Sequence, residues 1–117
     1  MKTKKQKLKE ECIKLASDKK LGEHPRCMFC NLPAVCSHHF IRQSRSNYLR
    51  CDKRNLIPIC KKCHFKLHNG YEAMMTLELV KIFGNKWAED LMRDSRKTIK
   101  DDIQYWEKIY NNLILKK

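Results

Sequence analysis

The 117-residue sequence has only three glycines and three prolines, the residues that most often interrupt helices and strands. Hydrophobic residues make up 42% of the chain, and this composition excludes disordered and collagen-like classes. No apolar run approaches the roughly 18 residues of a membrane span. Acidic residues, not an apolar stretch, follow the basic start of the chain, so we expect no signal peptide. We expect a cytoplasmic protein with a single domain over residues 1–117 and no membrane partner.

Acidic residues are also scarce. The chain has 26 Lys and Arg against 13 Asp and Glu, a formal net charge of +13. Residues 27–63 hold seven basic residues and one acid, Asp52, a net charge of +6. This imbalance indicates a polyanionic partner, for which nucleic acid is the leading candidate. Charge alone does not separate nucleic acid from an anionic membrane surface or from a role in solubility.

The hydrophobic pattern predicts a mainly helical α+β fold. An amphipathic helix is expected over Lys4–Lys20, ended by Gly22 and Pro25. Two short strands are expected over Ala34–Ile41 and Leu56–Ile59, joined by a basic loop. The other expected helices are Lys61–Asn69, Tyr71–Phe83, Asn85–Met92 and Thr98–Leu115.

Apolar stripes in the last three of these helices predict the core. Their spacing places the residues of each stripe on one helix face. We interpret these stripes as core because aromatic and methionine stripes seldom bind cofactors. The predicted core residues are Met74, Leu77, Val80, Trp87, Leu91, Ile99, Ile103, Trp106, Ile109 or Tyr110, and Leu113.

Seven cysteines without an export signal argue against a disulfide framework. Four of them form two C-x-x-C units, Cys27 with Cys30 and Cys60 with Cys63, which is a strong zinc signature. A structural Zn²⁺ bound by these four thiolates would stabilise a small domain, because its binding free energy becomes folding free energy. The units are separated by 29 residues, wider than in a zinc ribbon, so another feature lies between them.

The other three cysteines lack such partners. Cys12 is expected in the core, and Cys36 and Cys51 in a strand or loop.

Four of the five histidines lie within or just after the segment between the cysteine pairs. His64 and His68 are four residues apart on a predicted helix, so both rings lie on one face and can bind one cation. His38 and His39 are adjacent on a predicted strand and point to opposite faces. One of these two could bind a metal while the other accepts a proton.

Together these motifs resemble an HNH endonuclease with a zinc-binding frame and a ββα-metal core. The resemblance rests on the cysteine pairs, on the run Ser37-His38-His39-Phe40-Ile41, and on the run from Asn55 to His64. Within that superfamily, Tyr48-Leu49-Arg50-Cys51-Asp52 and Asn69-Gly70-Tyr71 are similar to the phage NinG (Rap) recombination endonucleases. The resemblance implies three parts: a basic N-terminal helix over 1–26, the core over 27–69, and a helical part over 70–117.

Roles follow from the resemblance, residue by residue. His39 would be the general base, and His38 and His64 would bind the catalytic divalent metal. Asn55 would tie the loop to the strand and orient His39, and His68 matches an additional histidine of colicin-type members. NinG-like relatives commonly have Asn at the position of His64 and a small residue at that of His38, which leaves the ligand set and the metal open.

The expected activity is hydrolysis of DNA phosphodiester bonds. A divalent cation (Mg²⁺, Mn²⁺ or Zn²⁺) would stabilise the developing charge, and a histidine can take the proton of the attacking water. By resemblance, cleavage leaves 5′-phosphate and 3′-hydroxyl ends, and branched recombination intermediates in a bacterial or phage-infected cell are expected substrates. One site per chain favours a homodimer or sequential nicks. The expected contacts to the DNA backbone are Arg42, Arg45, Arg50, Lys53, Arg54, Lys61, Lys62 and Lys66.

Two other classes of function remain open. A non-catalytic, zinc-dependent nucleic-acid-binding module would bind in a salt-sensitive manner without cutting. A protein-interaction zinc domain would use its helical stripes to bind a partner, but it leaves the adjacent histidines unexplained.

Overall fold

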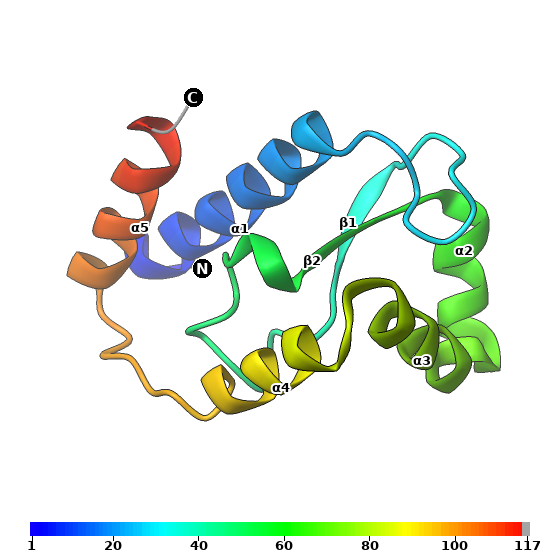
Figure 1. Ribbon diagram of the computed structural model, residues 1–117. Coiled ribbons are helices and arrows are strands. Elements are labelled where there is room, and N and C mark those ends of the chain that lie inside the picture. The colour runs from blue at the N-terminus through cyan, green and yellow to red at the C-terminus, as the bar shows by residue number, and fades with distance from the viewer. Residues whose placement is uncertain (116–117) are drawn as a thin grey trace.

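Helices surround a two-stranded antiparallel sheet in the computed structural model, which describes residues 1–115 (Figure 1). The fold is a small, mostly helical α+β structure, as the sequence predicts. Its elements are α1 (Lys4–Glu23), β1 (Cys36–His39), a 3₁₀ turn η1 (Lys53–Asn55), β2 (Leu56–Ile59), α2 (Lys61–Lys66), a π-type turn η2 (Leu67–Tyr71), α3 (Glu72–Phe83), α4 (Asn85–Asp94) and α5 (Ile103–Leu115).

Helix α1 begins with a capping box. The Thr3 hydroxyl accepts a hydrogen bond from the Gln6 backbone N–H, and the Gln6 side chain accepts one from the Thr3 N–H. The predicted start is confirmed, but the helix continues through Gly22 because a single helical glycine costs only about 1 kcal/mol. Helix α5 lies beside α1 (Figure 1), and the fully buried Cys12 thiol donates to the Trp106 carbonyl at 3.4 Å.

The sheet pairs Cys36 with Ile59 at one end and His39 with Leu56 at the other. All four residues of β2 are buried, because α1 also packs against the sheet. The predicted second strand is confirmed over its whole length, whereas the first is shorter than predicted. A loop over residues 40–52 and η1 connect the strands, and Asn55 is the last residue before β2.

The C-terminal half differs from the prediction at three points. Helix α2 ends at Lys66, and Asn69 and Gly70 have non-helical backbone angles, so the predicted helix to Asn69 is too long. Helix α4 extends two residues beyond the predicted end, to Asp94. Helix α5 starts at Ile103 instead of Thr98, because the Asp102 carboxylate accepts the Tyr105 N–H at 3.0 Å and caps the helix there.

The core assignment of α3 is also partly wrong. Met74 and Leu77 are 67% and 65% exposed, whereas Met75 and Leu79 are buried. Eight of the twelve positions of this helix are apolar and lie on several faces, so the sequence does not determine which face packs inward. The other helices bury Leu91 and Trp106, as predicted.

Candidate metal centre and histidine site

The two cysteine pairs come together in one cluster. The sulfur atoms of Cys27, Cys30, Cys60 and Cys63 all lie within 4.8 Å of one another. Four thiolates around one zinc ion, each about 2.3 Å from it, would be about 3.8 Å apart. The cluster can therefore hold a metal ion such as zinc, as the spacing predicts. Three of the four cysteines are buried and Cys30 is exposed.

A tight turn presents the first pair. The Asn31 backbone N–H donates to the Cys27 carbonyl at 2.9 Å, and Asn31 has a φ of 64°. Asparagine tolerates this left-handed conformation better than most residues, which explains its position directly after Cys30. The Met28 N–H donates to the Pro58 carbonyl at 3.0 Å and so attaches the turn to β2.

The second pair begins α2. Cys60 is the N-cap, and its sulfur accepts a hydrogen bond from the Cys63 backbone N–H at 3.4 Å. This hydrogen bond is the main cause that lowers the pKa of Cys60 to about 7. A thiol that ionises near neutral pH is a suitable metal ligand, since the thiolate is the binding form. Cys36 packs against the cluster without joining it.

His39 is 9% exposed and has contacts at both ring nitrogens. Its Nε2 donates to the Arg50 carbonyl at 2.8 Å, because a carbonyl oxygen can only accept. Its Nδ1 therefore accepts, and the Gln43 amide donates to it at 3.3 Å. Burial lowers the pKa of His39, and the Arg50 carbonyl opposes this effect. The ring is held in the tautomer whose Nδ1 can accept a proton.

Asn55 is completely buried at the end of the loop that precedes β2. Its side-chain oxygen accepts the Ile41 N–H at 2.6 Å, and its amide group donates to the carbonyls of Ile41 and Leu49 at 3.0 and 3.3 Å. These bonds tie the start of the loop, next to His39, to the segment that carries the Arg50 carbonyl. The side chain satisfies three backbone groups that would otherwise be buried without partners.

The remaining candidate histidines are only partly brought together. The Nε2 atoms of His64 and His68 are 3.0 Å apart. Burial, followed by the charges of His39, His64 and His68, lowers the pKa of His38 to about 4, so its ring is neutral at pH 7. Among residues 1–115, however, the cysteines are the only group of three or more potential ligands whose atoms all lie within 4.8 Å. His38 does not join His64 and His68 at that distance.

The predicted DNA-contacting residues fall into three groups. Arg42 pairs with Glu72 at 3.1 Å, and Arg54 bridges Asp52 and Asp94 at 2.8 and 2.9 Å. Five other predicted contacts are exposed and make no ion pair within residues 1–115: Arg45, Lys53, Lys61, Lys62 and Lys66. Arg50 donates to the Gln43 carbonyl and is half-buried.

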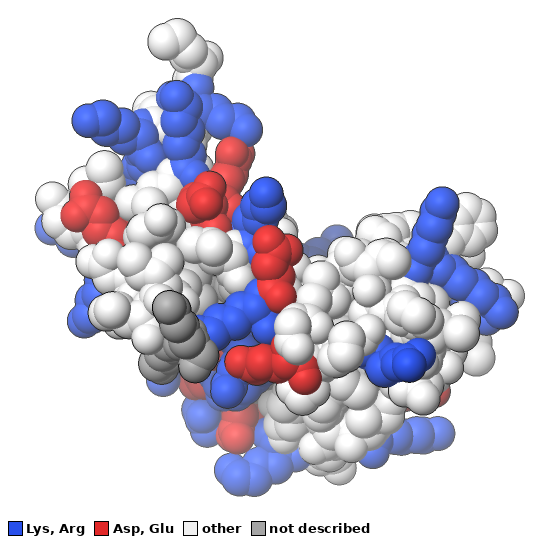
Figure 2. Space-filling model, turned by 90° about the horizontal axis from the view of Figure 1, so that it is seen from above, with Lys and Arg blue, Asp and Glu red and all other residues white. Residues whose placement is uncertain are grey.

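The basic residues do not form a continuous patch on the face of the molecule that Figure 2 shows. On the face seen in Figure 2, lysines and arginines lie both at the margin and near the middle, where acidic residues lie among them. The excess positive charge is therefore distributed over the surface of this face rather than concentrated at one point.

The sequence does not predict the contacts of His39 with Arg50 and Gln43. The Arg50 contact uses a backbone carbonyl, which any residue could provide, so its side chain gives no signal. Gln43 lies four residues beyond His39 in an irregular loop, where no periodicity indicates which side chains approach the ring.

Comparison with known proteins found no matching family model, curated protein or solved structure. Within residues 1–115, no helix combines the length and the apolar character needed to cross a membrane.

Proposed function

We propose that this protein is a metal-dependent DNA endonuclease of the HNH type, with a structural zinc bound by its four cysteines. The observation that carries the proposal is the environment of His39. A buried histidine with a proton on Nε2 and an acceptor at Nδ1 is suited to take a proton from an attacking water that replaces the Gln43 amide at Nδ1. The chain's net charge of +13 supports a polyanionic substrate.

In this mechanism, His39 acts as the general base and Asn55 as the residue that positions it. The Asn55 amide holds the loop against the strand, so the Arg50 carbonyl stays within hydrogen-bond distance of His39 Nε2. His38, His64 and His68 would hold a divalent cation, which would stabilise charge on the phosphate and the leaving oxygen. Binding one ion through all three requires their rings to rotate from the positions described.

The basic side chains would bind the DNA backbone. Exposed residues in the loop, such as Arg45, in η1, such as Lys53, and at the start of α2, such as Lys61, are available for phosphate contacts. Such contacts position DNA without reading its sequence. Branched recombination intermediates are the substrates that the resemblance to NinG-like enzymes favours, and a homodimer would allow both strands to be cut.

Nicking of supercoiled plasmid DNA tests the proposal. Wild-type protein should nick with Mg²⁺, Mn²⁺ or Zn²⁺, and His39→Ala should reduce the rate by about a hundredfold or more. The matched control is His24→Ala, at an exposed histidine beyond the end of α1, which should cut normally. DNA affinity and zinc content should stay near wild type in both variants. A His39→Ala protein that cuts normally would refute this mechanism.

A second candidate function is a zinc-dependent nucleic-acid-binding module without nuclease activity. The observation in its favour is that, within residues 1–115, only the cysteines form a close group of potential metal ligands. This candidate predicts salt-sensitive DNA binding and no nicking with any of the three cations. The plasmid assay therefore separates the two functions directly.

A further inference from the structure

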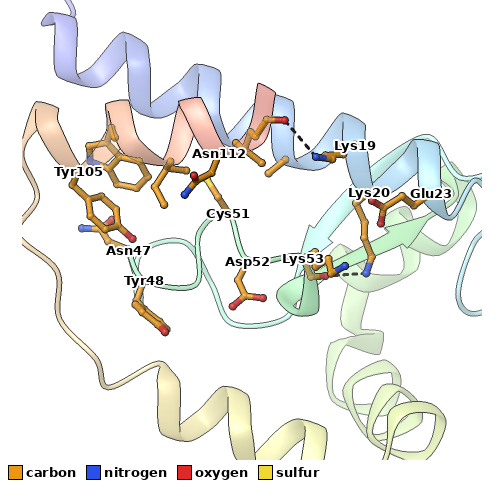
Figure 3. Close-up of a pocket in the computed structure, with 14 residues that line it drawn as sticks. Lys19, Lys20, Glu23, Asn47, Tyr48, Cys51, Asp52, Lys53, Tyr105 and Asn112 are labelled. Carbon is orange, nitrogen blue, oxygen red and sulfur yellow. Dashed lines mark hydrogen bonds between the residues drawn. The ribbon is translucent and has the colours of Figure 1, made fainter. Parts of the chain in front are cut away.

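A cleft of about 660 Å³ lies between α1, α5 and the loop segment 47–53 (Figure 3). Binding sites for small ligands typically measure about 300–1,000 Å³, so this cleft can admit a group of nucleotide size. None of the four clustered cysteines and none of the histidines lines it. It is therefore a separate feature from the candidate metal centre and the His39 site.

The inner wall of the cleft is aromatic. Tyr105, on α5, is half-buried, and its ring meets the fully buried Trp106 ring edge to face at a centroid distance of 5.0 Å. Tyr48 lies on the loop side, where Lys97 Nζ is 5.1 Å from the centroid of its ring. Because Trp106 fixes its orientation, Tyr105 offers a preorganised surface on which a flat ring can stack.

The other end of the cleft carries positive charge. Lys20 Nζ donates to the Lys53 carbonyl at 2.9 Å (Figure 3), and no carboxylate of residues 1–115 lies within ion-pair distance of it. Burial lowers the pKa of Lys20, and nearby Glu23 only partly opposes this effect. Glu23 and Asp52 also line the cleft, where three lysines (Lys19, Lys20 and Lys53) outnumber them, and the Asp52 carboxylate is paired with Arg54. A partly buried ammonium group held by a neutral carbonyl would gain from an anionic ligand such as phosphate.

A polar side chain lies between these two ends. Asn112 extends from α5 toward the loop (Figure 3), it is exposed, and its amide has no hydrogen-bond partner among residues 1–115. A carboxamide offers a donor and an acceptor side by side, and this pattern matches the edge of a nucleobase. The cleft thus combines a stacking surface, a base-edge partner and a cation.

We propose that this cleft binds an unstacked nucleotide, with its base on Tyr105, the base edge at Asn112 and its phosphate at Lys20 and Lys53. The inference rests on the proposed function in one respect, the assumption that the ligand is a nucleic acid. The cleft also adjoins the His39 site through the chain, since Arg50 provides the carbonyl that His39 contacts and the next three residues line the cleft. The preferred substrate is therefore DNA with an unpaired nucleotide near the bond that is cut.

Binding measurements with a fluorescent base test this proposal. The probe is a 12-nucleotide single strand with one central 2-aminopurine, compared with the blunt duplex of the same sequence and with free dAMP as competitor. The protein is loaded with its structural zinc beforehand, and the buffer contains no free divalent cation, so the probe is not cut. The single strand should bind more tightly than the duplex, and its emission should fall as the base stacks. If dAMP competes at concentrations near the Kd of the single strand, the natural ligand of the cleft is a free nucleotide rather than a nucleotide within DNA.

Variants locate the binding in the cleft. Tyr105→Leu should weaken binding of the single strand about tenfold and remove the fall in emission. Asn112→Ala, at an exposed position that should not affect folding, should weaken it about threefold to tenfold. Lys20→Gln should weaken it more than Lys14→Gln, which makes the same charge change at an exposed position on α1. Equal binding of strand and duplex, or unchanged affinity in both Tyr105→Leu and Asn112→Ala, would overturn the proposal.

The plasmid-nicking assay on the same variants keeps the two proposals apart. Binding of 2-aminopurine requires no cleavage, so an intact cleft with no nicking would reject only the nuclease. Nicking that depends on His39, without preferential binding of the single strand, would reject only the cleft.

Discussion

The His39 imidazole donates a hydrogen bond from Nε2 to the backbone carbonyl of Arg50, at 2.8 Å, across the connection between the two strands. A carbonyl has no proton to give, so this contact decides which ring nitrogen carries the hydrogen. Gln43, on the other side of the ring, donates to Nδ1. Arg50 and Gln43, both in the loop, thus make Nδ1 the basic nitrogen of the His39 ring.

The first prediction concerns this tautomer. Neutral His39 should carry its proton on Nε2, because Nδ1 has a donor opposite it and Nε2 has only an acceptor. Long-range ¹H–¹⁵N NMR correlation spectra of labelled protein measure the protonation of each ring nitrogen directly. His24, which is exposed, provides the internal reference for an unconstrained ring. A dominant Nδ1–H form of His39 would contradict the assignment.

The second prediction concerns Asn55. Asn55→Ala should lower the free energy of unfolding by about 3 kcal/mol, because it leaves buried backbone groups of Ile41 and Leu49 without partners. Urea denaturation measures this change. If the proposed mechanism holds, nicking should also fall under conditions where the variant is still folded, since the Arg50 carbonyl is no longer held in place. Ser44→Ala, at an exposed position of the same loop that does not line the cleft, is the control.

The third prediction concerns the metal. Purified protein should contain about one zinc ion per chain, measured by elemental analysis, and removal of the ion by a chelator should unfold it. Cys60→Ser should have the same effect, because Cys60 both contributes a sulfur to the cluster and caps α2. Cys51→Ser, outside the cluster, should keep its zinc. Full secondary structure in metal-free protein, observed by circular dichroism, would contradict a structural role.

The fourth prediction is a pH dependence of stability. Hydrogen bonds from Arg54 first, and then from Lys97 and Arg93, lower the pKa of Asp94 to about 2. A carboxylate with a lowered pKa in the folded state stabilises the fold above its unfolded pKa of about 3.9, and this contribution is lost as the pH falls toward 2. The difference in unfolding free energy between wild type and Asp94→Asn should therefore shrink as the pH falls from about 6 to about 2.5.

The comparison with Asp94→Asn also controls for the metal. Acid releases zinc by protonating its thiolate ligands, but it does so in both proteins, so this effect cancels in the difference. A difference that stays constant over the whole pH range would show that the Asp94 carboxylate does not titrate with folding.

Sequence patterns predict some parts of this structure because local geometry determines them. The C-x-x-C spacing places two sulfurs near one point in almost any turn or helix start, so the cysteine cluster was predictable. The second strand, Leu56–Ile59, is a short apolar run next to turn residues, and all of it is buried. The i, i+4 spacing of His64 and His68 likewise brings their rings together on one helical segment.

Other parts depend on tertiary contacts that no local pattern records. Met75 and Leu79, not Met74 and Leu77, face inward on α3, because the packing partners choose among several apolar faces. The start of α5 depends on the cap at Asp102. The sequence does not show whether Asp101 or Asp102 is the capping residue, because the two are adjacent and of the same type. The pairing of Arg54 with Asp94 joins residues 40 positions apart, so a basic residue expected at the DNA surface also serves as an internal ion-pair partner.

The two cysteine pairs lie on either side of the sheet in the sequence, and this order affects how the protein forms during synthesis. Cys27 and Cys30 leave the ribosome before the second pair exists, so four-sulfur coordination must wait until Cys63 has been made. Closing the 29 residues between the pairs then restricts the strand that carries His38 and His39 and the loop that carries Gln43 and Arg50 in one event. If the cluster binds zinc, the supply of zinc at that moment would set the fraction of newly made chains that fold.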